Sequence, residues 1–135
     1  MRILFVCTAN SCRSQMAEAW ARQMAPASWD IHSAGLLTFR ITAKTRAVME
    51  EVGLDMKGQK PQIIDKVDLN SFDRVVTLSQ EAGQYLPTLV HPDRHLHLPV
   101  TDPMSFKGDS EETRADFRRG RDEIRDIVAT LIDGK

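Results

Sequence analysis

The chain has 135 residues, of which 41% are hydrophobic and 27% are charged, and its formal net charge is −1. This size and composition are typical of one soluble globular domain, and the near-zero charge argues against a broad nucleic-acid-binding surface. The sequence has no apolar run near the roughly 18 residues of a membrane span and no signal peptide, so we expect a cytoplasmic protein without membrane or nucleic-acid partners.

The chain opens with a predicted strand, a loop and a helix that together favour an anion-binding site. Residues 2–7 form a short apolar run, and residues 14–25 carry apolar side chains at helical spacing. Cys7 ends the strand, and Arg13 and Ser14 follow where the helix begins. Unpaired backbone N–H groups and the positive end of the helix dipole gather there and stabilise both a thiolate and a tetrahedral oxyanion. We therefore predict a thiolate nucleophile that attacks a bound phosphate-like group.

The rest of the chain alternates between predicted strands and helices. Strands are expected at 30–34, 73–78 and 94–98, helices at 42–53, 80–86 and 110–132, and a polar loop at 56–62. This alternation predicts an α/β three-layer sandwich, with a four-stranded parallel sheet and helices on both faces. Since ligands bind beyond the carboxyl ends of parallel strands, four loops are expected to share one rim, at 7–13, 35–41, 79–82 and 99–106.

The cysteines and histidines give no sign of a disulfide scaffold or a metal site. Cys7 and Cys12 fall in one loop, so they cannot link distant parts of the fold. Their C-x4-C spacing has no matching Cys/His cluster, and we interpret His95 and His97 as ordinary strand residues, so no metal is expected. No G-x4-G-K-[ST] sequence occurs, which excludes a P-loop NTPase, and we expect no bound cofactor.

The opening motif resembles the signature of the low-molecular-weight protein tyrosine phosphatase superfamily, which contains tyrosine phosphatases and a branch of arsenate reductases. The resemblance rests on a late Asp102-Pro103 pair and on the run Val6-Cys7-Thr8-Ala9-Asn10-Ser11-Cys12-Arg13-Ser14-Gln15-Met16-Ala17-Glu18. It extends over nearly the whole chain, read as a single domain at 1–135, and implies a phosphatase-type anion loop after the first strand. The part of the run from Asn10 onward is closer to the arsenate reductase branch.

The resemblance implies a role for each residue of the motif. Cys7 matches the nucleophile, and Arg13 matches the planar clamp that holds two oxygens of a tetrahedral anion. Asn10 matches the residue that holds the strained loop, and Ser14 the hydroxyl that hydrogen-bonds the thiolate. Asp102 matches the general acid for the leaving oxygen, whereas an aspartate before proline is by itself typical of a turn. The oxyanion is also expected to contact the other loop residues, Thr8, Ala9, Ser11 and Cys12.

Two residues keep alternative interpretations. Phe39 lies six residues after Ser33, where phosphatases of this family often place an aromatic wall against the substrate ring, and it is equally a plain loop aromatic. Cys12 is either a redox guard, which joins Cys7 in a disulfide after mild oxidation, or a small buried packing residue.

The sequence departs from both branches of the family. Thioredoxin-coupled arsenate reductases carry two further cysteines after the third strand, and the matching positions here are Ser79 and Leu86. Many tyrosine phosphatases have tyrosine directly after the Asp-Pro pair, whereas residues 104–106 here read Met-Ser-Phe. The internal thiol relay is therefore missing, and the case for a phosphotyrosine protein substrate is weakened.

We predict from these features a cysteine-dependent phosphatase that hydrolyses phosphomonoesters of the phosphotyrosine type through a phosphocysteine intermediate. The alternative is an arsenate reductase that takes electrons from Cys12 or from an external thiol, such as glutathione, mycothiol or a glutaredoxin-like partner. A third possibility is a protein that binds oxyanions with little catalysis. The expected ligands are phosphate, arsenate or a similar oxyanion and a phosphorylated substrate.

Overall fold

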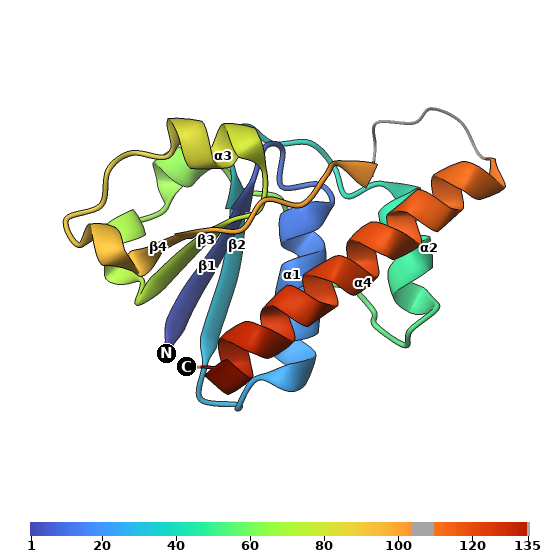
Figure 1. Ribbon diagram of the computed structural model, residues 1–135, viewed down its shortest axis with the longest axis horizontal. Helices are drawn as coiled ribbons and strands as arrows, with labels where there is room; N and C mark the ends of the chain where they lie inside the picture. Colours follow the sequence, from blue (N-terminus) through green and yellow to red (C-terminus); the bar gives the residue numbers. More distant parts are fainter. Residues whose placement is uncertain (104–109, 135) are drawn as a thin grey trace.

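The computed structural model describes residues 1–103 and 110–134 as an α/β structure built on a parallel sheet (Figure 1). Its strands are β1 (Arg2–Cys7), β2 (Asp30–Gly35), β3 (Arg74–Thr77) and β4 (His95–His97). Its α-helices are α1 (Arg13–Met24), α2 (Ala43–Glu50), α3 (Gln80–Tyr85) and α4 (Glu111–Gly134). Short 3₁₀ turns occupy Ile64–Lys66, Leu69–Ser71 and Pro92–Arg94. Within these described ranges the strand order is β2-β1-β3-β4, and every neighbouring pair is parallel.

Helices cover both faces of the sheet, which confirms the predicted three-layer sandwich. Ile3 and Phe5 of β1 belong to a core shared with α1, α2 and α4, whereas Leu4 and Val6 belong to a second core with α3 and the 3₁₀ turns. Residues 3–7 are at most 3% exposed, as expected for a parallel strand buried on both faces. The apolar run at the start of the sequence is therefore the inner strand that leads into the first loop.

The predicted helices and strands are all present, with ends that differ from the predicted ones by a few residues. The helix predicted at 42–53 ends at Glu50, before the chain turns at Gly53, whose φ of 79° lies in the left-handed region. The Thr42 hydroxyl accepts a hydrogen bond from the Thr45 N–H and so caps the start of this helix. The 3₁₀ turns are not predicted, because three residues carry no readable periodicity.

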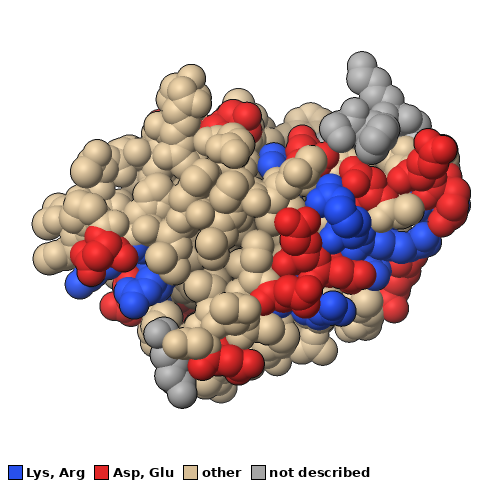
Figure 2. Space-filling view, in the orientation of Figure 1, with Lys and Arg blue, Asp and Glu red and all other residues tan. Residues whose placement is uncertain are grey.

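Helix α4 is an amphipathic helix of 24 residues. Its apolar side, with Phe117, Ile124 and Val128, packs into the core. Figure 2 shows charged side chains of both signs gathered on the side of the molecule that α4 occupies. In the described part of the chain, none of the helices combines the length and the apolar character that crossing a membrane requires.

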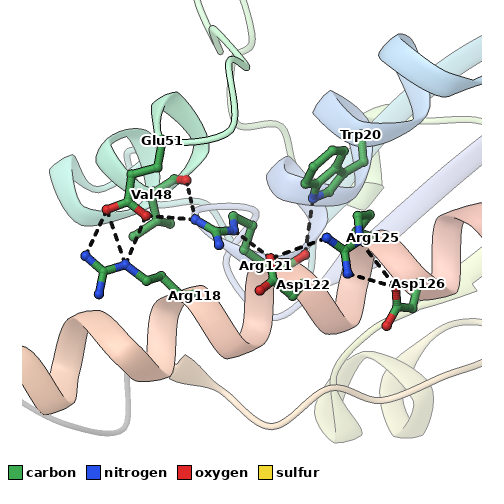
Figure 3. Close-up of polar contacts among 8 residues, drawn as sticks. All are labelled: Trp20, Val48, Glu51, Arg118, Arg121, Asp122, Arg125 and Asp126. Atoms are coloured by element: carbon green, nitrogen blue, oxygen red, sulfur yellow. Dashed lines mark hydrogen bonds and ion pairs between the residues drawn. The ribbon is translucent and has the colours of Figure 1, made fainter.

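Ion pairs and hydrogen bonds tie α4 to α1 and to the end of α2 (Figure 3). Glu51 accepts hydrogen bonds from Arg118 and from Arg121, and Arg121 Nη1 also donates to the Val48 carbonyl at 2.9 Å. The Trp20 Nε1–H donates to the Arg121 carbonyl at 3.2 Å. The hydrogen bond from Arg118 is the main cause that lowers the pKa of Glu51 to about 2.

The lowered pKa of Glu51 predicts a contribution to stability that depends on pH. The folded protein favours the carboxylate, so this contribution is fully present above the ordinary pKa of 4.5 and is lost as the pH falls toward about 2. We expect Glu51→Gln to lower the urea midpoint at neutral pH, and the difference from the wild type to shrink below pH 4.5. Urea titrations at neutral pH and at about pH 3 measure this, with Asp126→Asn on the exposed Arg125 pair as the control. A difference that stays constant down to about pH 3 would exclude a charge effect of Glu51.

Candidate active site

The carboxyl ends of the strands open into one cavity of about 650 Å³. Segments that follow each of the described strands line this cavity, namely Cys7, Thr8, Ala9, Ser11, Cys12, Arg13, Leu37, Phe39, Gln80, Glu81, Pro99, Val100, Thr101 and Asp102. Residues 104–106 of the fourth predicted loop, with their Met-Ser-Phe sequence, lie outside the described residues. For the described parts of the loops, the predicted shared rim is confirmed.

Asn10 holds the loop between β1 and α1 in a strained shape. Its φ of 51° lies in the left-handed region, which asparagine tolerates better than most residues. Its side-chain oxygen accepts hydrogen bonds from Gln15 Nε2 at 3.0 Å and from the Gln62 backbone N–H at 2.8 Å. Two N–H donors on one atom identify that atom as the amide oxygen, so the amide nitrogen of Asn10 faces Ser14.

Asn10 is linked to Cys7 through the hydroxyl of Ser14. The Asn10 Nδ2–H donates to Ser14 Oγ at 2.7 Å, and Ser14 Oγ lies 2.8 Å from Cys7 Sγ. When Cys7 is a thiolate it has no proton to donate, so the Ser14 hydroxyl, which accepts from Asn10, donates its own proton to the sulfur. A hydroxyl that donates to the sulfur stabilises negative charge there, as a nucleophilic thiolate requires.

Arg13 reaches from the start of α1 toward the segment that follows β4. Its Nη1 donates to the Val100 carbonyl at 2.9 Å, and its Nη2 lies 3.9 Å from Asp102 Oδ2. The Arg13 side chain is 9% exposed and that of Asp102 is 46% exposed, so the guanidinium is enclosed while the carboxyl stands nearer the solvent. The structure thus brings Cys7, Arg13 and Asp102 to one cavity, with Ser14 buried beside the sulfur.

Cys12 lies directly before α1 and is buried, with 3% of its surface exposed. Burial is the main cause that raises the pKa of its thiol to about 12, and a hydrogen bond with Thr45 opposes this shift. Cys12 therefore stays protonated near neutral pH. Both cysteines are free thiols, so the structure agrees with either interpretation of Cys12, as a redox guard or as a packing residue.

Phe39 lies at the mouth of the cavity, with 48% of its surface exposed. Its backbone N–H donates to the Ala9 carbonyl at 3.0 Å, and the Arg40 guanidinium lies 5.1 Å from its ring centroid. Gly35 permits this close approach of the two segments, because a Cβ there would lie 2.7 Å from the Asn10 nitrogen. Phe39 is therefore placed where an aromatic wall would stand, and its contact with a substrate stays a prediction.

Several polar residues around the cavity are not predicted from the sequence. The Gln15 side-chain oxygen accepts from Gln59 Nε2 at 2.8 Å, which fixes the amide that holds Asn10. Glu81 lines the cavity 3.1 Å from the Thr8 hydroxyl, and its own backbone N–H and then this hydroxyl lower its pKa. The sequence gives a signal for two of these residues, because Gln15 lies inside the motif and Glu81 lies in the loop at 79–82 that is expected on the rim. Gln59 comes from another segment and carries no such signal.

Ser79 and Leu86, the positions that match cysteines in the thioredoxin-coupled branch, make structural contacts here. Ser79 Oγ accepts from the Ala82 N–H at 3.0 Å and caps α3, and it also lies 3.1 Å from the Thr8 hydroxyl. Leu86 packs against the second core. Redox chemistry at Cys7 would therefore need Cys12 or a thiol from outside the chain.

The strand histidines lie on one face of β4 and contact a hydroxyl. His95 Nε2 and His97 Nδ1 lie 2.9 and 2.8 Å from the Thr77 hydroxyl oxygen. Burial is the main cause that lowers the pKa of His95. Over residues 1–103 and 110–134, the structure places no group of three or more His, Cys, Asp or Glu side chains that could hold a metal ion.

Several known proteins are similar in sequence to this chain over nearly its whole length. An arsenate reductase of Bacillus subtilis (strain 168) is 42% identical over 122 residues, which cover 90% of this chain and 88% of that protein. An arsenate reductase of Halalkalibacterium halodurans is 37% identical over 131 residues, which cover 97% and 94% of the two chains. A solved structure described as an arsenate reductase in the phosphate binding state has a TM-score of 0.83 and 32% identity, over 98% of this chain and 97% of that one.

A family model also matches this chain and identifies the family to which it belongs. The model described as low molecular weight phosphotyrosine protein phosphatase matches residues 2–134. This match confirms the resemblance predicted from the opening motif, and the protein belongs to the low molecular weight phosphotyrosine protein phosphatase family.

Proposed function

We propose that the protein reduces arsenate at Cys7 and takes its electrons from an external thiol. Phosphate and arsenate are tetrahedral oxyanions of similar shape, so the cavity around Cys7 suits both and does not rank the two activities. The observation that carries the proposal is the identity of 37% and 42% to proteins named arsenate reductase, over at least 90% of this chain. The alternative stated from the sequence therefore takes precedence over the phosphatase that the sequence led us to predict first.

The proposed first step joins the substrate to the enzyme. The Cys7 thiolate attacks arsenic while Arg13 binds two oxygens of the oxyanion. An As–S bond forms, an As–O bond breaks, and Asp102 supplies the proton with which the leaving oxygen departs as water. Ser14, which lies 2.8 Å from Cys7 Sγ, stabilises the attacking thiolate.

The proposed second step transfers the electrons. A thiolate of the donor attacks Cys7 Sγ, an S–S bond forms, and the As–S bond breaks with its electron pair on arsenic, which leaves as arsenite. A second donor thiol then opens the mixed disulfide and restores Cys7. Two thiols are thereby oxidised to one disulfide for each arsenate reduced.

The donor is proposed to lie outside the chain because the internal thiols are unsuitable. The sequence has two cysteines, and the one other than Cys7 is Cys12, whose pKa is raised to about 12 by burial. A thiol protonated at neutral pH is a weak nucleophile, so Cys12 would compete poorly with an external thiolate during turnover, whereas its slower reaction with an oxidised Cys7 in the absence of a donor meets no such competition.

Arsenite production tests this proposal directly. The purified protein is incubated with arsenate and, in turn, with glutathione, with mycothiol and with each of these plus a glutaredoxin-like protein. Arsenite is then measured by chromatography with elemental mass spectrometry. We expect at least one donor to support turnover that Cys7→Ser lacks. Arsenite at the Cys7→Ser level with every donor would contradict the proposal.

Phosphomonoester hydrolysis is the second candidate, because the cavity also supplies the groups that this reaction needs. Cys7, Arg13 and Asp102 are the groups that a phosphocysteine mechanism needs, and they line one cavity whose mouth carries the exposed side chains of Leu37 and Phe39. Hydrolysis also needs no second thiol. Release of p-nitrophenol from p-nitrophenyl phosphate, compared with arsenite production under the same conditions, ranks the two activities.

Cys12→Ala is predicted to keep turnover within about threefold of the wild type but to lose recovery after mild peroxide treatment. Peroxide converts Cys7 to a sulfenic acid, which condenses with the Cys12 thiol to a disulfide and water, and a reductant then restores both thiols. Peptide mass spectrometry of the treated wild type measures this disulfide. Sulfinic acid at Cys7 beside a reduced Cys12 would exclude the guard role. Loss of arsenate turnover with every donor would instead make Cys12 the internal reductant.

A further inference from the structure

Helix α4 holds the short segment that carries Asp102. Arg119 of α4 donates from its Nη2 to the Thr101 carbonyl at 3.1 Å. Figure 1 shows the segment after β4 running beside α4. We infer that Arg119 is a positioning residue for Asp102, and this inference rests on the acid role proposed above for that aspartate.

The contact acts on Asp102 through one peptide plane. The Thr101 carbonyl and the Asp102 N–H belong to the same planar unit. This plane also contains the Asp102 Cα. A hydrogen bond that holds the Thr101 carbonyl oxygen therefore orients the backbone to which the Asp102 side chain is attached. A general acid is effective only when its proton is held within hydrogen-bond reach of the leaving oxygen, so this orientation matters for the reaction.

Arg119 is itself held in place by acids on its own helix. Asp116 and Glu123 lie three residues before and four residues after it, on the same side of α4, and each contacts it at 2.9 Å. The Asp116 side chain is 17% exposed and that of Arg119 is 37% exposed. Asp116 lies against Nε and Nη2, and Glu123 lies against Nη1. The guanidinium is therefore held at two edges while its Nη2 also donates to the Thr101 carbonyl.

Two further contacts anchor the residues on either side of Asp102. Arg13 Nη1 donates to the Val100 carbonyl at 2.9 Å. Pro103 packs on Gly120 of α4, where a Cβ would lie 3.3 Å from the proline ring. Val100 and Pro103 are therefore fixed without Arg119, and the peptide between Thr101 and Asp102 is the part of the segment that the Arg119 contact orients.

A double-mutant cycle tests whether Arg119 acts through Asp102. Arg119→Met removes the donors, and Arg119→Lys keeps a cation beside Asp116 so that the fold is preserved even where the methionine variant is unstable. Arg125→Met is the matched control, because Arg125 lies on the same helix, is 45% exposed and pairs with Asp122 and Asp126. Turnover is measured with arsenate plus the active thiol donor and with p-nitrophenyl phosphate.

We expect both Arg119 variants to lower kcat about fivefold with little change in KM, and to change it less than about 1.5-fold in the Asp102→Asn background. Arg125→Met should leave kcat unchanged in both backgrounds. Equal loss from the Arg119 variants in the two backgrounds would overturn the inference, because it would indicate a general structural effect.

Backbone dynamics measured by NMR relaxation give a readout that needs no turnover. The Val100 N–H is bonded to the Leu78 carbonyl at 2.9 Å and serves as an internal reference. Because Arg119 holds the Thr101 carbonyl, which shares a peptide plane with the Asp102 N–H, we expect the order parameter of the Asp102 amide to fall from about 0.85 to below about 0.6 in both Arg119 variants, while that of Val100 stays unchanged. If the wild type turns over neither substrate, the proposed function fails and this measurement still decides the positioning role. An unchanged order parameter at Asp102 in both Arg119 variants would overturn it.

Discussion

Cys7→Ser is expected to abolish turnover of both arsenate and phosphate esters while the fold and oxyanion binding persist. Cys7 ends the buried strand β1, and its sulfur lies 2.8 Å from Ser14 Oγ. A serine fits this position, but its hydroxyl hardly ionises at neutral pH. Removing a nucleophile typically lowers kcat by more than about 1,000-fold. The anion loop, Arg13 and their hydrogen bonds are left in place.

The measurements are turnover with each substrate, together with phosphate binding by calorimetry and the thermal unfolding midpoint. Cys12→Ser is the matched control, since it makes the same chemical change at the other cysteine of the loop. We expect this control to retain turnover. Cys7→Ser with more than a few per cent of the wild-type rate would mean that the nucleophile is a different residue.

Asp102→Asn is expected to slow the reaction most for substrates with poor leaving groups. Asparagine keeps the shape of the side chain but cannot supply a proton, and general acids typically contribute about 100-fold to 10,000-fold. An activated aryl ester needs little protonation of its leaving oxygen, so its deficit should be smallest. Arsenate loses an oxygen as water, which places its reduction among the most affected reactions.

A series of aryl and alkyl phosphates with rising leaving-group pKa measures this dependence for hydrolysis, and arsenite production measures it for reduction. Glu81→Gln is the control, because it removes a carboxylate from the same cavity. Its effect should not depend on the leaving group. A loss that is equal across the series would remove Asp102 from the acid role and leave it as a residue that shapes the cavity.

The two predicted activities differ in whether they need electrons and not in the geometry of the site. Arsenate reduction requires thiols as a source of two electrons, whereas hydrolysis of a phosphate ester requires none. The sequence favoured a phosphatase because Ser79 and Leu86 replace the relay cysteines, and the structure gives both positions ordinary structural contacts. Family membership is shown, and relatives named arsenate reductase fit the alternative better than the first prediction. The external thiol that we propose would reconcile the missing cysteines with those names.

The sequence by itself determined the order of the elements, the parallel sheet and the anion loop. These features are local, because the period of the apolar residues decides between strand and helix within a short window. Cys7, Arg13 and Ser14 lie within one stretch of eight residues, so their spacing alone indicated an oxyanion site. Asp102 was predicted through the family resemblance, because an aspartate before proline is by itself typical of a turn.

Only the tertiary structure decided which residues support the anion loop and whether the Cys12 thiol is protonated. Gln59 and Gln62 reach Gln15 and Asn10 from another segment, and Arg119 reaches Thr101 from α4. The raised pKa of Cys12 comes from burial, which depends on the packing of the whole chain. The spacing of apolar residues cannot predict such contacts, because they join residues that are distant in sequence and come close only after the chain has folded.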